Sequence, residues 1–403
     1  MPQGWKTSIG PYLSVFVERF CAAEDLATYD PYDIWMTPLG FAVKNFYNRW
    51  PVAGLPPAAL LSVFDNFFNN DRRWFYVRRE YPIVRAMAAQ CLVNLFRENS
   101  DARLLDFAAR HLEWLVANSC TGYSGPCWGL GFRYPVTADI FYGPNTPLST
   151  MTPYALEAFL AWREALCKTR FDSVIRGILE FLDRDLCVME EDDEGMATSY
   201  GPWRDRVVIN AVTYTLYAYS LLLPFAARQR SLGIRRKIGK LCRYVLRQQR
   251  PDGSWLYSPH GRSFIDCFHT CIVLKNLVKA DRAVHLPDSE AAVRAGYLYL
   301  KKAFLDEQEF LFRRFSLRSK PGIVRFDLYD NAEALNLALL LGDFDLANRL
   351  LPRVLERFVD GLDIYSQIDV AGIRRNKNTL RWAVMPLLCA MSQRIGRLAA
   401  PAN

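Results

Sequence analysis

Apolar positions recur with a helical period along most of the chain, and strand-like alternation of apolar and polar residues is nearly absent. Apolar helices rich in Ala and Leu are predicted to begin, at steps of 47 to 70 residues, near Pro82, Thr152, Asn210, His269, Asn331 and Asn378. More charged, amphipathic helices are predicted between them, over residues 101–118, 170–186, 232–249, 290–304 and 344–359. This second, longer period indicates a repeated helical hairpin.

An apolar helix that alternates with a half-polar helix predicts two concentric layers. Inner helices are covered on all sides and are apolar all round, whereas outer helices keep one solvated face. Six repeats of about 60 residues favour an all-α fold, a closed (α/α)6 toroid or six-hairpin barrel. Helices predicted near 9–23 and 37–49 form a lid or part of a seventh pair. We expect one α/α-toroid domain over 1–403, in which 1–70 supply the N-terminal helices and 71–403 the repeating hairpins.

The composition excludes several classes of protein. A chain of 403 residues with 51% hydrophobic and 23% charged residues is globular rather than disordered. Four histidines argue against a multi-histidine metal centre. Ten cysteines, without a Cys-x-x-Cys pair and without a recognisable secretory signal, favour free thiols and a cytoplasmic location. No stretch reaches the ~20 apolar residues of a membrane span, and the net charge of +8 favours acidic partners.

The segments that enter the apolar helices carry aromatic and ionisable residues. If the inner helices run parallel, these segments meet at one end of the barrel, together with helix N-termini that favour anions. Aromatic faces stack on sugar rings, and arginines hold carboxylates or phosphates. The candidates for binding a substrate are Trp128, Arg133, Arg206, Trp255, Tyr257, Tyr329, Asp330, Arg381 and Trp382. The alternative is that these residues only cap helices and fill the barrel mouth.

The segment from Asp266 to Cys271 is the densest cluster of reactive side chains. Asp266 and His269 are three residues apart and share one face of a helical turn, so the carboxylate would orient the imidazole as a general acid or base. Asp327 and Tyr200 are the other candidate catalytic residues. We expect Asp266 and His269 to line one cavity, together with Trp128, Tyr200, Arg206, Asp327 and Arg381.

Zinc binding is an alternative for the same segment. Cys267, His269 and Cys271 carry suitable ligand atoms. Phe268 to Cys271 is similar to the zinc-histidine segment of protein prenyltransferase β subunits, and Asp185-Leu186-Cys187 has the form of the Asp-x-Cys that accompanies it. Its surroundings do not match that family, and buried cysteines are usually small hydrophobes. We therefore expect no metal and no cofactor.

Two charged segments are predicted to be solvated. Residues 190–194 form an acidic run without the spacing of a calcium loop. Residues 228–250 carry nine arginines and lysines and no acid. This strip could contact a membrane or an assembly complex. It contains one aromatic residue, Tyr244, and so lacks the interleaving typical of single-strand nucleic-acid binders.

Short motifs along almost the whole chain resemble one family in their order and spacing. They are Tyr29 to Asp33, Cys127-Trp128-Gly129, Asn145-Thr146-Pro147, Ser199 to Pro202, Gln249 to Trp255, Asp266 to Thr270, Asp327 and Arg381-Trp382. The chain resembles the six-hairpin, glycosidase-like proteins encoded in bacterial exopolysaccharide, capsule and O-antigen gene clusters, which implies a role in surface-polysaccharide production. It departs from them at Tyr329, where the family often has His, at Glu333, where it has Gln, and at Cys267, where it usually has Asn.

These observations favour an enzyme that modifies or cleaves an anionic polysaccharide or lipid-linked oligosaccharide. Hydrolysis needs two carboxyl groups, and the candidates are Asp266, Asp327, Asp330, Asp205 and Asp33. Lyase or epimerase chemistry needs a base, a proton donor and a cation, for which the candidates are His269, Tyr200 or Tyr329, and Arg206 or Arg381. The alternatives are a non-catalytic scaffold of a polysaccharide assembly complex and a zinc-dependent transferase.

Overall fold

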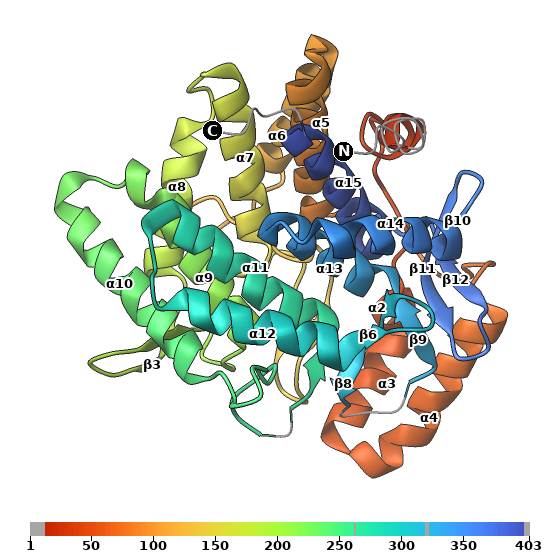
Figure 1. Ribbon diagram of the computed structural model, residues 1–403. Helices are drawn as coiled ribbons and strands as arrows, with labels where there is room; N and C mark the ends of the chain where they lie inside the picture. Colours follow the sequence, from red (N-terminus) through yellow and green to blue (C-terminus); the bar gives the residue numbers. More distant parts are fainter. Residues whose placement is uncertain (1–12, 262, 319–321, 399–403) are drawn as a thin grey trace.

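Six apolar helices form a closed ring in the computed structural model, which describes residues 13–261, 263–318 and 322–398 (Figure 1). Each inner helix packs against the next, and the last packs against the first. They are α5 (Pro82–Asn99), α7 (Thr152–Leu166), α9 (Ile209–Leu222), α11 (Cys267–Val284), α13 (Leu328–Leu341) and α15 (Met385–Leu398). The predicted all-α toroid is therefore confirmed.

The outer layer alternates with the ring along the sequence. It comprises α6 (Ala102–Ala117), α8 (Asp172–Arg184), α10 (Arg228–Arg247), α12 (Ser289–Phe304) and α14 (Phe344–Phe358). Residues 13–20 are also helical. They lead to Cys21, whose Sγ lies 4.0 Å from Sδ of Met385 at the start of α15. This helix thus takes the outer position beside α15. The first residues of the helix predicted over 9–23 lie outside the described residues.

The inner and outer helices bury different fractions of their surface, as the hydrophobic pattern predicts. In α9, 13 of 14 residues are buried, and in α13 also 13 of 14. In the outer helix α8, 6 of 13 residues are buried, and they are spaced along one face. An inner helix has neighbours on every side, so it needs apolar residues all round, whereas an outer helix needs only a stripe.

Short strands lie in the long connections that lead from each outer helix to the next inner helix. The antiparallel pairs are β1 (Tyr134–Pro135) with β2 (Phe141–Tyr142), β3 (Val188–Glu191) with β4 (Met196–Thr198), β5 (Ile265–Asp266) with β8 (Phe315–Leu317), and β6 (Leu305–Asp306) with β7 (Leu311–Phe312). A larger sheet has the order β10 (Val359–Asp360), β11 (Asp363–Asp369), β12 (Arg374–Lys377), with β9 (Val324–Asp327) also paired to β11. These connections form the mouth of the barrel.

The last inner helix begins later than predicted. The pattern predicts a start near Asn378, but a π-helical turn, Leu380–Val384, precedes α15. This turn places Arg381 and Trp382 against buried aspartates of the mouth. π-helical turns are rare in proteins, and those that occur often lie at functional sites. A 3-10 turn, Leu223–Phe225, similarly extends α9.

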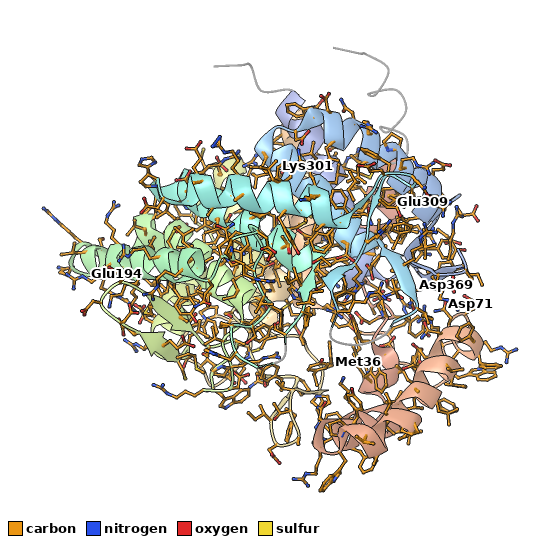
Figure 2. All side chains as sticks on the ribbon, turned by 60° about the horizontal axis from the view of Figure 1, so that its bottom comes forward. Met36, Asp71, Glu194, Lys301, Glu309 and Asp369 are labelled. Atoms are coloured by element: carbon orange, nitrogen blue, oxygen red, sulfur yellow. The ribbon has the colours of Figure 1, made fainter. Side chains whose placement is uncertain are left out.

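The N-terminal region forms a helical hairpin at the side of the barrel. After the short α2 (Asp33–Met36), α3 (Pro38–Arg49) and α4 (Pro51–Val63) pack against each other, and a π-helical turn follows at Phe64–Phe68. Both overall views show this hairpin projecting from the edge of the barrel (Figure 1, Figure 2). It contacts the mouth through α3, which packs on β1.

The two charged segments contact each other rather than only solvent. The acidic run lies at the β3–β4 hairpin, which packs against α10. Lys240 Nζ donates to Glu191 at 2.8 Å, and Arg247 Nη1 donates to Asp192 at 2.9 Å. The paired side chains of Asp192 and Arg247 stay 55% and 42% exposed, so both segments are solvated as predicted and also pair with each other. Opposite charges attract each other because the fold brings the two segments together. They lie about fifty residues apart in the sequence, so the sequence alone does not predict this contact.

A buried histidine lies outside the barrel mouth, on the outer helix α6. Arg85 Nη1 lies 2.9 Å from Nδ1 of His111, and Nε2 lies 2.6 Å from the carbonyl oxygen of Cys21. Because arginine only donates and a carbonyl only accepts, the imidazole is neutral with its proton on Nε2. Burial, with the nearby charge of Arg85, lowers the pKa of His111 to about 4.

This histidine predicts a loss of stability in mild acid. The unfolded chain binds a proton on His111 below pH 6.5, and the folded chain does so only near pH 4, so the free energy of unfolding falls as the pH falls between these values. Between pH 7.5 and pH 4.5 the loss from this residue is about 2.5 kcal/mol. Urea denaturation of wild type and His111→Gln should therefore show a shallower pH dependence in the variant. The solvent-exposed His285→Gln should match wild type, and parallel curves for wild type and His111→Gln would contradict the assignment.

Candidate functional site

Aromatic and charged side chains from several connections form a continuous set of contacts at the barrel mouth. One part of it begins at Tyr142 in β2, whose ring stacks on Tyr200 with 6.1 Å between centroids. The guanidinium of Arg206 lies 4.9 Å from the centre of the Tyr200 ring and 6.0 Å from that of Tyr257. The Tyr257 ring lies 4.6 Å from the imidazole of His269. The structure thus brings together four predicted site residues: Tyr200, Arg206, Tyr257 and His269.

The second part of the mouth continues from the residue next to His269. Phe268 meets Tyr329 edge to face at 5.0 Å, and Tyr329 stacks on Trp382 at 4.8 Å. The Arg381 guanidinium lies 5.5 Å from the Trp382 ring. On the far side, Tyr32 packs edge-on against Trp382 at 5.1 Å. Tyr329, Arg381 and Trp382 therefore lie in the mouth, as predicted.

His269 and Asp266 form a hydrogen-bonded dyad at the start of α11. Asp266 ends β5 and precedes the first residue of the helix, and the hydroxyl of Thr270 donates to its carbonyl oxygen at 2.7 Å. Nδ1 of His269 lies 2.8 Å from both carboxylate oxygens. A carboxylate only accepts, so Nδ1 carries the proton and Nε2 has a free lone pair when the ring is neutral.

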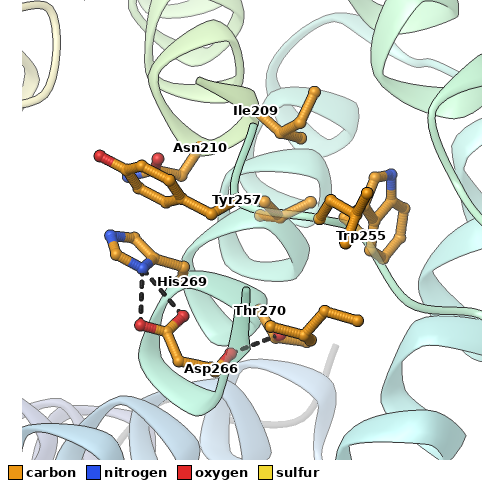
Figure 3. A pocket seen from close by; sticks show the side chains of 10 residues that line it. Ile209, Asn210, Trp255, Tyr257, Asp266, His269 and Thr270 are labelled. Carbon is orange, nitrogen blue, oxygen red and sulfur yellow. Dashed lines mark hydrogen bonds and ion pairs between the residues drawn. The ribbon is translucent and has the colours of Figure 1, made fainter. Parts of the chain in front are cut away.

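The second nitrogen of His269 is available for chemistry. Nε2 has no hydrogen-bond partner among the described residues, and the side chain is 19% exposed, whereas that of Asp266 is 2% exposed. Figure 3 shows Nε2 of His269 and the hydroxyl of Tyr257 pointing to the same side, away from Asp266. The dyad therefore presents a correctly oriented base to the mouth, with its carboxylate protected from solvent.

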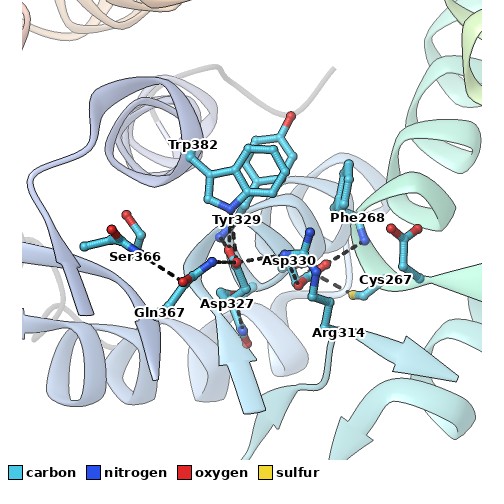
Figure 4. A network of polar contacts seen from close by, with 12 residues as sticks. Cys267, Phe268, Arg314, Asp327, Tyr329, Asp330, Ser366, Gln367 and Trp382 are labelled. Atoms are coloured by element: carbon cyan, nitrogen blue, oxygen red, sulfur yellow. Dashed lines mark hydrogen bonds and ion pairs between the residues drawn. The ribbon is translucent and has the colours of Figure 1, made fainter. Parts of the chain in front are cut away.

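Asp327 holds three segments of the mouth together (Figure 4). It caps α13 by accepting from the backbone N–H of Tyr329 at 2.9 Å. Its side chain also accepts from Nη1 of Arg314 at 2.8 Å, from Nε2 of Gln367 at 3.1 Å and from Nε1 of Trp382 at 3.0 Å. It is fully buried. With every lone pair engaged, Asp327 is placed to fix the geometry rather than to contact a substrate.

Asp330 is the second buried carboxyl beside Arg314. It accepts from the backbone N–H of Phe268 at 2.9 Å, and its other oxygen lies 3.7 Å from Nη1 of Arg314. Burial raises the pKa of Asp330 well above its usual range, although Arg314 opposes the shift. Like Asp327 it is fully buried, so its role in this geometry is also structural.

The three arginines of the mouth differ in how far they are neutralised. Arg381 forms a bidentate pair with Asp30, at 2.6 and 2.9 Å. Arg314 is paired with Asp327. Arg206, in contrast, has no hydrogen bond within the described part of the chain, and its nearest carboxylate oxygen, on Asp205, is 3.9 Å away. Burial disfavours its charge, but the surrounding tyrosines and Asp205 raise the pKa of Arg206 above its ordinary value. Arg206 therefore stays charged, and its N–H groups can donate hydrogen bonds to an anionic ligand.

Three predicted binding residues lie outside this set of contacts, although Trp255 lines the small cavity beside His269. Trp128 is fully buried and donates from Nε1 to the carbonyl of Leu115 in α6 at 2.9 Å. Trp255 likewise donates to Val245 in α10 at 2.9 Å. Both indoles face the outer layer, because a buried Trp N–H needs an acceptor. Arg133 lies outside the contact set, with its guanidinium 4.1 Å from the ring of Phe41 in the N-terminal hairpin.

The two remaining candidate carboxyls are engaged with neighbours. Asp205 accepts a hydrogen bond from the hydroxyl of Tyr142. Asp33 accepts from the backbone N–H of Asp30 at 2.8 Å and from Arg79 at 3.3 Å. Burial raises the pKa of Asp33 to about 7, against the lowering effect of its backbone hydrogen bond. It is 1% exposed and so lies behind the surface of the mouth.

The cavity beside the dyad is small. Asp266, His269, Tyr257 and Trp255 line a cavity of about 10 Å³, which has room for about one water molecule. Trp128, Tyr200, Arg206, Asp327 and Arg381 do not line it, so the prediction of one shared cavity is wrong as stated. Tyr200, Arg206 and Arg381 are linked to His269 through the contact set above, and Asp327 through its hydrogen bond to Trp382, whereas Trp128 is not part of that set. A larger cavity of about 220 Å³, beside His111, lies away from the mouth.

The structure offers no ligand set for the zinc alternative. Among the described residues, no group of three or more His, Cys, Asp and Glu side chains is placed to hold a metal ion. Cys267 and Cys271 are buried, and burial raises the pKa of both thiols. Asp185 of the Asp-x-Cys segment instead accepts from the backbone N–H of Ser124 at 2.8 Å.

Polar groups continue below the mouth into the ring. Nζ of Lys275 in α11 donates to Glu333 in α13 at 2.5 Å, and both are buried. Burial lowers the pKa of Lys275, but the charge and hydrogen bond of Glu333, together with the charge of Glu157, raise it, so the net shift is upward. The glutamate that departs from the family's pattern thus balances a buried lysine. The hydroxyls of Tyr154 and Tyr214 lie 2.5 Å apart in the same layer.

Sequence analysis missed Arg314, Gln367 and Tyr142. Arg314 lies in the connection before α13, fourteen residues ahead of its first residue. Pairing of β5 with β8 brings it to the start of α11, where its carbonyl oxygen accepts from the N–H of Cys267 at 2.9 Å. The adjacent arginines at 313 and 314, within a segment that enters an inner helix, were the available signal.

No protein-family model and no curated protein sequence matches this chain. Solved structures do. A cellobiose 2-epimerase from Bacillus thermoamylovorans is 10% identical, with 79% of this chain and 88% of that chain covered and a TM-score of 0.61. A GH76 α-mannanase from Bacteroides thetaiotaomicron is 10% identical, with 92% and 99% covered and a TM-score of 0.56. A polysaccharide lyase is 11% identical, with 85% and 99% covered and a TM-score of 0.52. The chain therefore has the six-hairpin toroid fold of these enzymes.

The structural role of Arg314 can be tested against its neighbour. Arg314→Met leaves Asp327 buried without its cation and should lower the free energy of unfolding by about 3–5 kcal/mol. Arg314→Lys keeps the charge and should lose less. Arg313→Met removes one cation from the buried Asp306, which keeps Arg325 at 3.6 Å and the backbone N–H groups of Gln308 and Glu309, so it should cost less than Arg314→Met. Urea denaturation of the three variants checks this, and equal losses at 313 and 314 would show that the mouth does not depend on the Arg314–Asp327 pair.

Proposed function

We propose that this protein is a carbohydrate-processing enzyme that removes a proton from a sugar carbon next to a carbonyl or carboxyl group. The His269–Asp266 dyad carries this proposal, because it offers one oriented base at a mouth lined by aromatic rings. General bases of this kind contribute about 10²–10⁴-fold to a rate. The similarity in fold to an epimerase and to a polysaccharide lyase supports this class of reaction by analogy.

Hydrolysis fits the same residues less well. Glycoside hydrolysis needs two carboxyl groups that reach the glycosidic bond from opposite sides. Asp327 and Asp330 are fully buried behind Trp382 and Phe268, and Asp266 is bonded to His269. The site therefore offers no such pair among the described residues.

The chemical steps follow from the positions of the side chains. Nε2 of His269 takes the proton, and the electron pair of the C–H bond moves into an enolate, which Arg206 stabilises by binding the adjacent carboxylate. Asp266 stabilises the imidazolium that forms. In an epimerase, the hydroxyl of Tyr200 or Tyr329 returns a proton to the other face of the carbon. In a lyase, the bond to the leaving oxygen breaks instead, and that oxygen takes the proton.

Arg206 supports an acidic sugar as the substrate. A mouth arginine without a hydrogen-bonded partner can bind a carboxylate in bidentate fashion, and Tyr200 and Tyr257 keep its guanidinium in place. With the sequence motifs described above, this supports a substrate that is an anionic polysaccharide or lipid-linked oligosaccharide in the production of bacterial surface polysaccharides. Ten free cysteines support a cytoplasmic location for this step.

A non-catalytic scaffold is the second candidate. The small volume of the cavity beside His269 favours it, because a sugar must bind in the mouth outside that cavity. In the enzyme, His269 removes a proton from the bound sugar. In the scaffold, the sugar binds without reacting.

The catalytic proposal is tested with uronic-acid oligosaccharides in heavy water. Epimerase chemistry incorporates deuterium into the sugar, and lyase chemistry produces an unsaturated product that absorbs in the ultraviolet. Replacing His269 by Ala should lower either rate by about 10²–10⁴-fold. His260→Ala, which removes an exposed histidine paired with Glu190, should leave the rate unchanged. A folded His269→Ala protein with the rate of wild type would favour the scaffold.

The role of Arg206 is tested by comparing acidic and neutral substrates. Arg206→Met should lower kcat/KM for a uronic-acid substrate by about 10- to 100-fold, the value of a charge-assisted hydrogen bond, and should have little effect on a neutral analogue. Arg204→Met, which changes an exposed arginine two residues away, is the matched control. An equal loss on both substrates would show that Arg206 maintains the shape of the mouth and does not bind the carboxylate.

A further inference from the structure

We propose that the N-terminal hairpin, residues 38–78, docks onto the surface of a membrane that contains anionic lipids. This proposal does not depend on the proposed reaction. Twelve of the 24 exposed large apolar side chains among the described residues lie between Leu39 and Val77. Val52 is 89% exposed, Phe75 85% and Leu60 70%. A patch of this size on a water-soluble surface marks a site of contact with a partner or a membrane.

The helix α4 is the strongest feature of this surface. Its 13 residues contain no charged side chain, and Ser62 is the one polar residue. A helix that is apolar all round is normally buried in a core or in a membrane. Here Gly54 is the one residue of α4 that the described part of the chain buries. Pro57, Ala58 and Leu61 are half-buried, and the other apolar side chains of α4 are exposed, so they lack the apolar environment that their composition requires.

The length of α4 favours lying at the membrane surface. Thirteen residues of helix extend about 20 Å, which is less than the ~30 Å of the hydrocarbon layer. Among the described residues, no helix is long and apolar enough to cross a membrane. An apolar helix of this length with aromatic neighbours fits the boundary between headgroups and acyl chains. Trp50 and Trp74, which are 60% and 48% exposed, are of the type enriched at that boundary.

The charge of the hairpin favours anionic lipid over a second copy of this chain. Residues 38–78 contain five arginines and lysines against two aspartates. Arg49 and Arg78 pair with the exposed Asp139 and Asp25 outside the hairpin, at 3.1 and 3.3 Å, but their side chains stay 61% and 53% exposed. The guanidinium of Arg72 lies 4.7 Å from the Trp74 ring. Anionic headgroups attract such a rim. A symmetric dimer would bring two positive hairpins together, which like charges oppose.

The N-terminal hairpin lies next to the barrel mouth. Phe41 in α3 packs edge-on against Phe141 in β2 at 6.4 Å, and the guanidinium of Arg133 lies 4.5 Å from the Phe141 ring. Tyr142, the next residue, begins the contact set of the mouth. Docking of the hairpin would therefore bring the mouth close to the membrane surface.

The test is co-sedimentation of the full chain with vesicles of phosphatidylcholine, with and without phosphatidylglycerol. Wild type should bind the vesicles that contain phosphatidylglycerol, and high salt should weaken the binding. Val52→Glu/Leu60→Glu should lower the bound fraction at least tenfold, because both carboxylates would have to enter the interface. The matched control is Leu232→Glu/Leu298→Glu, at positions on α10 and α12 that are 70% and 61% exposed. It should bind as wild type does.

Several outcomes would overturn the proposal. They include absence of wild-type binding to either vesicle, and equal binding by wild type and Val52→Glu/Leu60→Glu. Loss of binding in Arg235→Glu/Arg236→Glu, with no loss in the hairpin variant, would assign docking to α10. A concentration-dependent dimer that Val52→Glu/Leu60→Glu dissociates, without vesicle binding, would assign the hairpin to a second copy. Equal thermal melting curves establish that the variants are folded. None of these outcomes depends on catalysis, so the proposed reaction is tested separately.

Discussion

The ion pair between Arg314 and Asp327 fixes the part of the mouth on which the candidate site depends. Taking a guanidinium and a carboxylate out of water costs several kcal/mol for each ion, and only close pairing with further hydrogen bonds offsets the cost. Asp327 receives those bonds from the start of α13, from β11 and from the π-helical turn before α15. One buried carboxylate thus joins three segments that are distant in sequence. It holds Trp382, and through it Tyr329, in front of the ring.

The number of hydrogen-bond and ion-pair partners separates structural residues from candidate functional residues. Asp327, Arg314 and Arg381 are buried, charged and fully paired, as charges in a folded interior must be. His269 and Arg206 lie in the same mouth, but each keeps a nitrogen without a partner among the described residues. One oxygen of Asp330 also lacks a partner, but Asp330 is enclosed by the protein, whereas the side chains of His269 and Arg206 are 19% and 31% exposed. A nitrogen that has no partner and is also accessible from the mouth is more informative about function than the paired charges around it.

The sequence predicted the framework better than the mouth, because a helical period extends over many residues. Five of the six inner helices begin within three residues of the predicted position, and the sixth begins later because of the π-helical turn. All the strands except the seven-residue β11 have two to four residues, which is too short to show a period. Position in the sequence assigns Trp128 to the mouth, but its N–H finds an acceptor in the outer helix α6. Arg314 reaches the mouth through a strand pairing that no local pattern encodes.

The distribution of charge explains why a modest net charge of +8 can still select anionic partners. Much of the positive charge of α10 is neutralised within the chain, by the β3–β4 hairpin and by α8. Arg228, Arg235 and Arg236 remain at the surface of α10, but no exposed apolar patch accompanies them in the way that one accompanies the N-terminal hairpin among the described residues. Positive charge coincides with apolar or aromatic surface at Arg206 and along residues 38–78. At those two places an anionic group can gain both a charge-assisted hydrogen bond and an apolar contact, and they are the places proposed here for an acidic sugar and for anionic lipid.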